Sequence, residues 1–369
     1  MKNKLKYNLQ NLIGRRVNKR ILIIESDDWG CIRMPSKQVF DTLLNQGIPV
    51  DKCPYNSNDM LESADDINGV IQCFQSLKDS KGNSLKLTAN FIVANPDFEK
   101  IRKSDFNEYH FQDFVETYSR EQGNLSTFDA IKNAIELGVL QPQLHGREHL
   151  QPFEWLSALK SGDSETLFAF GLGVWGHPSK YSLNTGINFS SAFHAAEKSQ
   201  IDFFKVSITE AQRIFKSHFG FYSKSFIPPR YIWMNELNET LKENNIELLQ
   251  GKIVQLQPEF SENNSLKAVR VWQGKKLNHG VRCVTRNVFF EPAEKPKFNW
   301  ESDAFSRIQA AFNWGKPAVI SMHRLNFMGG LNPENRENNL ERLRKLIVQV
   351  LKTYPDVEFQ TTDQLAELY

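Results

Sequence analysis

Long apolar runs are absent from this chain of 369 residues. Uncharged apolar stretches are short, as in 21-ILII-24, whereas a helix that crosses a membrane needs about 18 consecutive apolar residues. The first 20 residues also lack the apolar core of a secretion signal, because Asn, Gln and Lys interrupt them. We therefore expect a cytoplasmic protein with no signal peptide and no transmembrane segment.

Cysteine is scarce and shows no pattern. The four cysteines have no CxxC spacing, which argues against both a cysteine-held zinc site and a dense disulfide framework. We expect all four to be reduced thiols. They are Cys31, Cys53, Cys73 and Cys283.

An excess of charge of either sign is also missing, with 45 Lys+Arg against 43 Asp+Glu. Residues 1–20 nevertheless carry seven basic side chains and no acid, so the remaining 349 residues hold 38 basic and 43 acidic side chains. A net charge of −5 on this body excludes a protein that tracks nucleic acid. Apolar residues in this segment fall near helical spacing, namely Leu5, Leu9, Leu12, Ile13 and Val17. We therefore expect residues 1–20 to form a basic arm with a helix docked on the body. A membrane-surface anchor is the less favoured alternative.

The rest of the chain alternates β-rich runs with amphipathic helical stretches, which is typical of parallel α/β proteins. Helices are expected at 128–137 and along the apolar stripe from Leu340 to Leu351. Residues from about 249 to 292 alternate in the manner of strands and are interpreted as a β-rich insertion or an extension of the sheet. We expect residues 21–369 to form one domain. The expected strands are 21–24, 85–95, 139–146 and 317–323, of which the first and last are expected to be buried, and 225–229 is expected to be a short strand-to-loop transition.

Polar side chains follow these predicted strands where each strand ends. Asp27 and Asp28 come directly after the first strand, His145 and His149 after the third, and His323 ends the last. In α/β barrels the carboxyl ends of the strands line one mouth, where active sites are built. Residues about 300 positions apart in the sequence are therefore expected to meet there.

These residues suit a metal site with an acid and a base beside it. Two adjacent carboxylates at a strand end can have different roles, one binding a metal and the other a water. An Asp-Asp pair is also common in turns and as a helix cap. His145 and His149 are four apart, which would place both rings on one side of a helical turn. A histidine such as His323 is often only a satisfied core residue. Together they predict a His2Asp metal site with open positions and a separate acid and base.

The order Asp-Asp, His-x-x-x-His, Pro-Pro and a late His resembles the NodB-type polysaccharide deacetylases, carbohydrate esterase family 4, from about residue 20 to 365. The segments 88-TANFIVANPDF-98 and 226-FIPP-229 are similar to family segments. The resemblance implies a distorted (β/α) barrel of about seven strands and a divalent metal, most often zinc, that serves to remove N- or O-acetyl groups from sugars. It also implies that Asp28, His145 and His149 hold the metal, that Asp27 is the general base, and that His323 is the general acid.

The chain departs from the family pattern, which marks it as a divergent branch. Glu25-Ser26 precedes the two aspartates where the family usually has Thr/Ser-Phe, and 299-NWESD-303 is a loose counterpart of an acidic-Trp motif. Ile227 stands where an arginine normally tethers the catalytic base, and Arg230 follows three residues later. Arg230 is therefore assigned to the catalytic group, with Arg33 and Arg286 as the other arginines able to orient Asp27.

Several other sequence patterns give weaker evidence about function. The glycines of 171-GLGVWG-176 match a dinucleotide fingerprint, but no amphipathic helix follows, which favours a loop at the barrel mouth. Core packing and stacking on sugar rings are equally expected for four aromatic residues near the motifs. These are Trp29, Trp155, Tyr231 and Trp233.

The sequence thus predicts a metal-dependent deacetylase-like hydrolase acting on an acetylated oligo- or polysaccharide, with no nucleic-acid partner. The same two histidines and carboxylate also suit Fe(II) in an oxygenase. A carbohydrate-binding member of the fold without turnover, or one that transfers acetyl groups, is a further alternative. Sugar identity and oligomeric state are left open.

Overall fold

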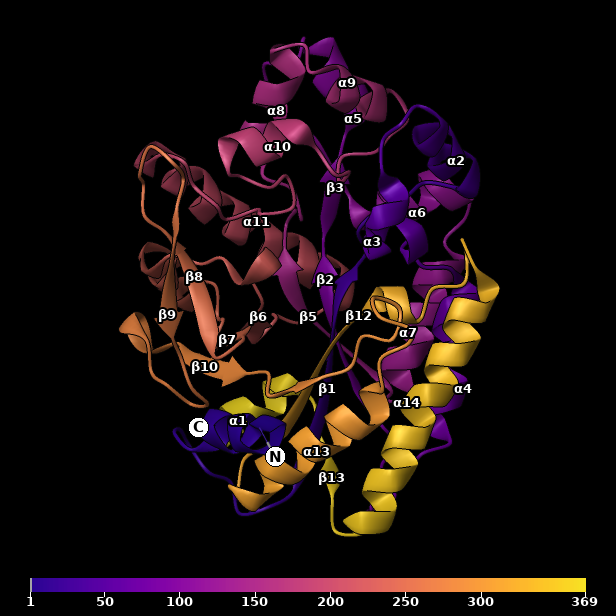
Figure 1. The fold of residues 1–369 in the computed structure, drawn as a ribbon, viewed down its shortest axis with the longest axis vertical. Coiled ribbons are helices and arrows are strands. Elements are labelled where there is room, and N and C mark those ends of the chain that lie inside the picture. The colour runs from indigo at the N-terminus through magenta and orange to yellow at the C-terminus, as the bar shows by residue number, and fades with distance from the viewer. Residues whose placement is uncertain (1) are drawn as a thin grey trace.

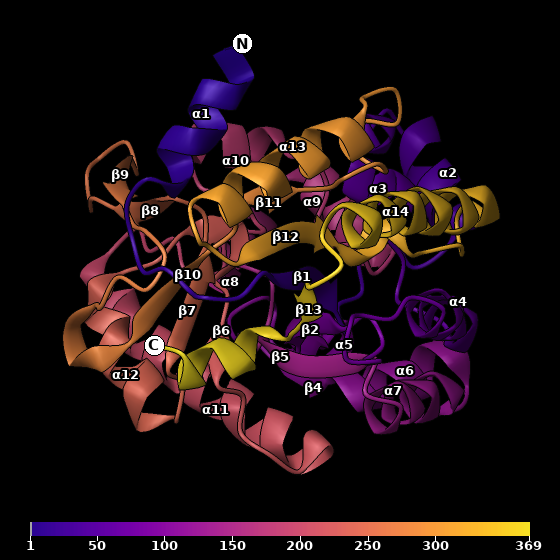
Figure 2. The same ribbon diagram turned by 90° about the horizontal axis from the view of Figure 1, so that it is seen from below.

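The computed structural model describes residues 2–369, with side chains from Leu5 onward, so Met1 of the basic arm lies outside the described residues. A parallel sheet curls through the centre, and helices surround it (Figures 1 and 2). A short strand, β13 (Glu358–Phe359), adds to β1. In spatial order the strands are β10 (Arg282–Thr285), β7 (Leu248–Gly251), β6 (Ser225–Phe226), β5 (Leu140–Gly146), β2 (Leu87–Ile92), β1 (Ile21–Trp29), β12 (Ala318–His323) and β11 (Val288–Phe289).

The two ends of this strand order adjoin in the sequence. Only Arg286 and Asn287 separate β10, which pairs with β7, from β11, which pairs with β12. If β10 and β11 are taken as halves of one strand position, the sheet has the seven positions of a distorted barrel. The predicted fold class is confirmed.

The helices lie outside the barrel and begin at recognisable caps. Ser63 and Asp66 form a reciprocal capping box at the start of α4, and Asp97 and Asp163 cap α5 and α9. No helix within residues 2–369 has the length and apolar character to cross a bilayer. The helices are α1 (Lys2–Asn11), α2 (Lys37–Asn45), α3 (Pro54–Asn58), α4 (Ala64–Gln75), α5 (Phe98–Lys103), α6 (Phe114–Gln122), α7 (Ser126–Glu136), α8 (Pro152–Lys160), α9 (Ser164–Gly171), α10 (Lys180–Thr185), α11 (Ile201–Phe219), α12 (Asn238–Glu243), α13 (Trp300–Asn313) and α14 (Pro333–Thr353).

Strand β1 shows how the barrel interior changes from apolar to polar. Its side chains alternate between two faces, as in any strand. Leu22 and Ile24 join the large core between sheet and helices, whereas Ile21 and Ile23 join a smaller apolar cluster that includes Val284 and Val319. Glu25 and Asp27 continue the face of Ile21 and Ile23 toward the carboxyl end of the barrel.

The segment 249–292 lies only partly outside the main sheet. Its ends supply β10, β11 and most of β7, all of which are barrel strands. The part that leaves the barrel is an antiparallel hairpin of β8 (Val254–Pro258) and β9 (Leu266–Arg270). A second antiparallel pair outside the barrel is β3 (Ala94–Pro96) with β4 (Phe111–Asp113).

The N-terminal helix α1 lies against α13, at the end of the barrel opposite the carboxyl ends of the strands (Figure 1). Its contacts are polar: Tyr7 hydrogen-bonds to Asp303, and Asn11 accepts a 2.9 Å bond from Asn287. The expected apolar stripe does not make this contact. Leu5 and Leu9 are 64% and 59% exposed, and Leu12 and Ile13 lie beyond the end of the helix, because the chain bends away at Gly14 with a φ of 105°.

Candidate active site

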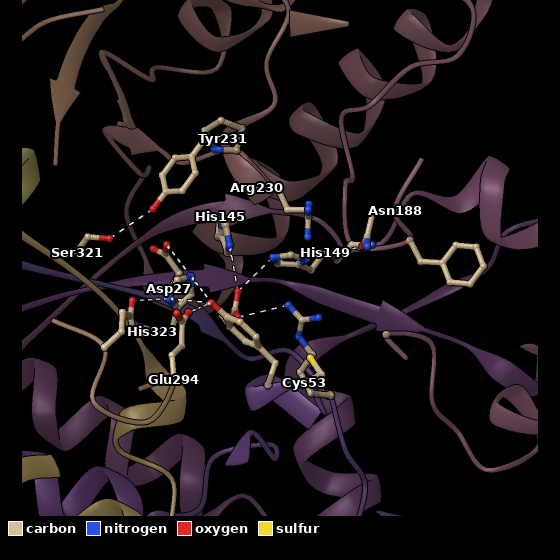
Figure 3. A pocket seen from close by; sticks show the side chains of 18 of the residues that line it. Asp27, Cys53, His145, His149, Asn188, Arg230, Tyr231, Glu294, Ser321 and His323 are labelled. Carbon is tan, nitrogen blue, oxygen red and sulfur yellow. Dashed lines mark hydrogen bonds and ion pairs between the residues drawn. The ribbon is translucent and has the colours of Figure 1, made fainter. Parts of the chain in front are cut away.

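A cavity of about 560 Å³ opens at the carboxyl ends of the barrel strands (Figure 3). It brings together side chains from the ends of β1, β5 and β12 and from the loops that follow β6 and β11. All six predicted site residues line it. They are Asp27, Asp28, His145, His149, Arg230 and His323.

A break in β1 turns both aspartates into the cavity. Neighbouring residues of a regular strand point to opposite faces. The pairing of β1 with β2 is interrupted between Ser26 and Trp29, and Asp28 has a φ of 76°, in the left-handed region that non-glycine residues rarely adopt. The bulge lets Asp27 and Asp28 serve one site, and such strain is concentrated at functional sites.

Three donor atoms converge in the candidate metal centre. Asp28 Oδ1 lies 3.2 Å from His145 Nε2 and 3.3 Å from His149 Nε2, and the side chains of all three are buried. Ligand atoms on a tetrahedral zinc ion, with bonds of about 2.0–2.2 Å, lie about 3.3 Å apart. The spacing therefore fits three ligands of one small divalent cation.

The hydrogen bond made by the His145 ring also supports a role for His145 as a metal ligand. Its Nδ1 lies 2.7 Å from the carbonyl oxygen of Ile227, which can only accept, so Nδ1 carries the proton. In the neutral ring, Nε2 then directs a lone pair at the Asp28 carboxylate, an arrangement that a cation between them would stabilise. Burial and the nearby charge of Arg33 lower the pKa of His149 to about 4, so the His149 ring is neutral at pH 7.

The two histidines do not share a helical turn, and this expectation from their spacing was wrong. His145 is the penultimate residue of β5, and His149 lies in the loop that follows. Gly146, with a φ of 129°, falls where the pairing of β2 with β5 shifts register. This irregularity turns the chain so that the two rings meet edge to face, with an interplanar angle of 75° and centroids 5.0 Å apart.

Arg33 completes the surroundings of Asp28. Its Nη2 lies 3.5 Å from Asp28 Oδ2, which leaves Oδ1 toward the histidines. The guanidinium also lies 4.8 Å from the ring centre of Trp175. Gly176 allows this approach, since a Cβ there would come within 3.1 Å of Arg33 Nη1.

The arginine that holds Asp27 is Arg286, whereas Arg230 makes no contact with this carboxylate. Arg286 bridges the two oxygens of Asp27 at 2.6 and 2.7 Å and reaches Glu25 at 2.5 Å. Burial would raise the pKa of Asp27, but the Arg286 charge and hydrogen bonds outweigh it and hold that pKa well below its usual range. Asp27 is therefore ionised at any physiological pH. Arg286 reaches it because it lies between β10 and β11, where the barrel closes.

His323 lies on the other side of Asp27, 3.8 Å from its Oδ2 through Nε2. Its Nδ1 is 2.6 Å from Glu291 Oε1, and the Tyr55 hydroxyl lies 3.3 Å from both ring nitrogens. Burial would lower the pKa of His323, but Glu291 and the other nearby carboxylates raise it well above its usual value. His323 is thus a protonated imidazolium near neutral pH, able to donate from Nε2 into the cavity.

Replacing Glu291 with Gln is expected to move the alkaline limb of the pH–rate profile. If protonated His323 is the active form, the rate falls as pH rises through its pKa. Asp27, Glu294 and Tyr55 also face His323, but Glu291 makes the shortest contact, so its loss lowers that pKa. The alkaline limb should move to lower pH by about one unit or more. The measurement is kcat against pH for both proteins, and Glu301→Gln, which removes a carboxylate paired with Arg342, is the control. An unmoved limb would contradict the role of Glu291.

Three further residues of the cavity were not predicted from the sequence: Glu291, Glu294 and Tyr55. Glu291 does follow a strand end, as the predicted residues do, but its strand falls in the segment interpreted as an insertion or a sheet extension, which was not expected to contribute to the site. Tyr55 lies in the short helix α3 and carries no signal in the sequence.

The aromatic candidates divide in the structure. Trp29, Trp155 and Trp233 are completely buried and belong to the core, so they cannot stack on a sugar ring. Tyr231 does line the cavity, as does His177, whose ring nitrogens have no hydrogen-bond partner. Trp300, from the segment 299–303, also borders the cavity at the start of α13.

No protein-family model and no curated protein matches the sequence. Solved structures resemble it in overall fold. One is a 4-alpha-glucanotransferase from Thermococcus litoralis, with 10% identity and a TM-score of 0.47 over 95% of this chain but only 40% of that one. Another is described as a probable polysaccharide deacetylase from Pseudomonas aeruginosa PAO1, with 10% identity and a TM-score of 0.45 over 95% of this chain and 90% of that one. A family 4 carbohydrate esterase from Streptomyces lividans matches with 10% identity and a TM-score of 0.36, over 95% and 96% of the two chains.

Proposed function

We propose that this protein is a metal-dependent hydrolase that removes N- or O-acetyl groups from a carbohydrate. The observation that carries the proposal is the convergence of Asp28, His145 and His149 in one cavity, with Asp27 and His323 beside them. Zinc is the proposed ion, since two imidazoles, one carboxylate and an open position are a usual catalytic zinc site.

The residues divide the chemistry of acyl hydrolysis between them. Asp28, His145 and His149 would hold a divalent ion, which when bound would supply Lewis-acid polarisation of the acyl carbonyl and a water of lowered pKa. Asp27, fixed in its ionised form by Arg286, accepts the proton of the attacking water at a carboxylate oxygen. His323 Nε2–H donates a proton to the departing amine or alcohol, so that the leaving group departs neutral.

The acid and base favour hydrolysis over the oxygenase alternative. An oxygenase needs open positions on its iron but no paired proton donor and acceptor. Here Asp27 and His323 lie 3.8 Å apart, and each is held by a buried partner of opposite charge, Arg286 or Glu291. This arrangement suits one group that takes a proton and a second that gives one.

Substitution of His145 by Ala should abolish stoichiometric zinc binding and acetate release together. The reason is that His145 would supply one of only three protein ligands. The measurement is metal content after zinc loading and desalting, together with thermal unfolding to show that the variant folds. Asp28→Asn provides a second variant with little change of shape. His218→Ala, a histidine paired with Asp113 away from the cavity, is the matched control. A variant that keeps its zinc would contradict the assigned ligands.

The activity itself is tested with a panel of N- and O-acetylated sugars and oligosaccharides. Zinc-loaded protein should release free acetate from at least one of them, and the Asp28→Asn variant should not. Stoichiometric iron in the purified protein with 2-oxoglutarate-dependent turnover would overturn the proposal. So would transfer of the acetyl group to a second sugar without acetate release.

A further inference from the structure

Two cationic side chains of the cavity have no acidic partner. Each cavity carboxylate has a charged or hydrogen-bonding partner. The pairs are Asp27 with Arg286, Asp28 with Arg33, Glu291 with His323, and Glu294 with Tyr55. Arg230 and Lys252 also line the cavity, but within residues 2–369 neither has a carboxylate in ion-pair range. Neither cation is therefore paired with a carboxylate of the cavity, and a divalent cation in the neighbouring site would add further positive charge.

Arg230 is held in the cavity by a strained piece of backbone. It follows Pro228-Pro229 and has φ 55° and ψ 16°, and Tyr231 after it has a φ of 59°. Consecutive left-handed residues other than glycine cost about 1–2 kcal/mol each, so the turn persists only because its surroundings enforce it. Figure 3 shows the Arg230 guanidinium reaching toward His149.

The electrostatic surroundings of Arg230 are unfavourable in the absence of a ligand. Partial burial and the positive charge of Arg33 lower the pKa of the Arg230 guanidinium. The side chain is nevertheless accessible from the cavity. A guanidinium that is repelled by the charge of another, and that is accessible from the cavity, would be stabilised by a bound anion.

Lys252 is held in the same cavity by contacts with two aromatic rings. Its Nζ lies 4.2 Å from the ring centre of Tyr231 and 5.5 Å from that of Phe289. The Tyr231 ring is itself anchored, since its hydroxyl lies 3.4 Å from Ser321 Oγ and accepts a 3.2 Å bond from Arg286. Lys252 therefore packs on the ring of a fixed aromatic residue, which directly follows Arg230 in the chain and which a sugar ring can contact.

We propose that Arg230 and Lys252 form a subsite for a negatively charged group of the substrate, so that the acetylated carbohydrate is an anionic one. The inference rests on the proposed function and adds the class of sugar. A carboxylate or a phosphate on the unit next to the acetylated one would meet the two cations. Arg230, first assigned to orient the base, is thus a residue that selects the substrate.

The test compares matched oligosaccharides. One is a neutral acetylated oligomer, the second carries a uronic acid in the neighbouring unit, and the third carries a phosphate there. We expect the unmodified protein to prefer one charged oligomer, by at least about 10-fold in kcat/KM. Arg230→Gln should remove most of this preference by lowering kcat/KM for the charged oligomer about 10-fold, and Lys252→Gln should lower it by a smaller factor. Lys267→Gln, which removes an exposed cation from β9 outside the cavity, should leave the preference unchanged.

Failure of this inference and failure of the proposed function have different outcomes. Acetate release without preference for charge, or a preference that Arg230→Gln does not alter, would overturn the subsite and leave the hydrolase intact. If no sugar yields acetate, the hydrolase proposal fails, and calorimetric binding of the uncleaved charged oligomers decides the subsite. Binding that Arg230→Gln weakens and Lys267→Gln does not would support it; equal binding by both variants, or none by the unmodified protein, would overturn it.

Discussion

Asp27→Asn should lower the rate of acetate release by about 10²- to 10⁴-fold while the protein keeps its metal. The substitution retains the size of the side chain and removes the charge that accepts the proton. The proposed metal ligands are untouched, because the donor atoms belong to Asp28, His145 and His149. The measurements are kcat at saturating substrate and zinc content in the same preparation.

A matched control for this variant is Asp97→Asn. Asp97 caps α5 through a 3.0 Å bond from the Lys100 amide, and asparagine caps a helix about equally well. The control makes the same chemical change without reaching the cavity, so its rate should be unchanged. If Asp27→Asn keeps both metal and rate, Asp27 is not the base. If it loses the metal, Asp27 belongs among the ligands.

Arg324→Met should destabilise the fold by about 3–5 kcal/mol, because it leaves buried carboxylates without their cation. Arg324 follows His323 and is completely buried, with Asp59 and Glu62 as its acidic partners. It also donates to the Cys31 carbonyl, so it joins the loop after β1 to the end of β12. The measurement is the free energy of unfolding from urea denaturation at pH 7.

The pH dependence identifies the cause of that loss. Burial, only partly offset by Arg324, already raises the pKa of Asp59 to about 6. In the variant this carboxyl takes up a proton in the folded state at a higher pH than in the unfolded state. The folded state is therefore favoured as pH falls, and the deficit should shrink between about pH 7 and pH 5. A deficit that does not change with pH would contradict the explanation.

Arg342→Met is the control for Arg324→Met. Its partner Glu301 lies in an ion pair whose two side chains are 21% and 26% exposed. Water already screens such a pair, so its loss should cost only about 0–1 kcal/mol. Equal losses in the two variants would show that burial of the Arg324 cluster is not the source of its effect.

The amino-acid sequence by itself determined the local helices and strands, and it showed that the candidate site residues come directly after strand ends. Continuous apolar runs predicted β1 and β12, and the spaced leucines predicted α14, because burial of one face depends on a residue's own neighbours. Parallel strands place their carboxyl ends on one side, so the polar residues after them could be expected to meet. Asp27 and His323 are an example, because they lie toward the carboxyl ends of the adjacent strands β1 and β12 and are partners in the register of these strands.

Only the tertiary structure decided which partners these residues have. Arg286 rather than Arg230 holds Asp27, although 259 positions separate them, because the barrel closes at Arg286. Glu291 pairs with His323 because it also lies just after the point where the barrel closes. The bulges at Asp28 and Gly146 orient the side chains of the proposed ligands, and no residue pattern in the sequence predicted these bulges. Periodicity records which face of an element is buried, whereas contacts between distant segments depend on how the sheet curls, and that is a property of the whole chain.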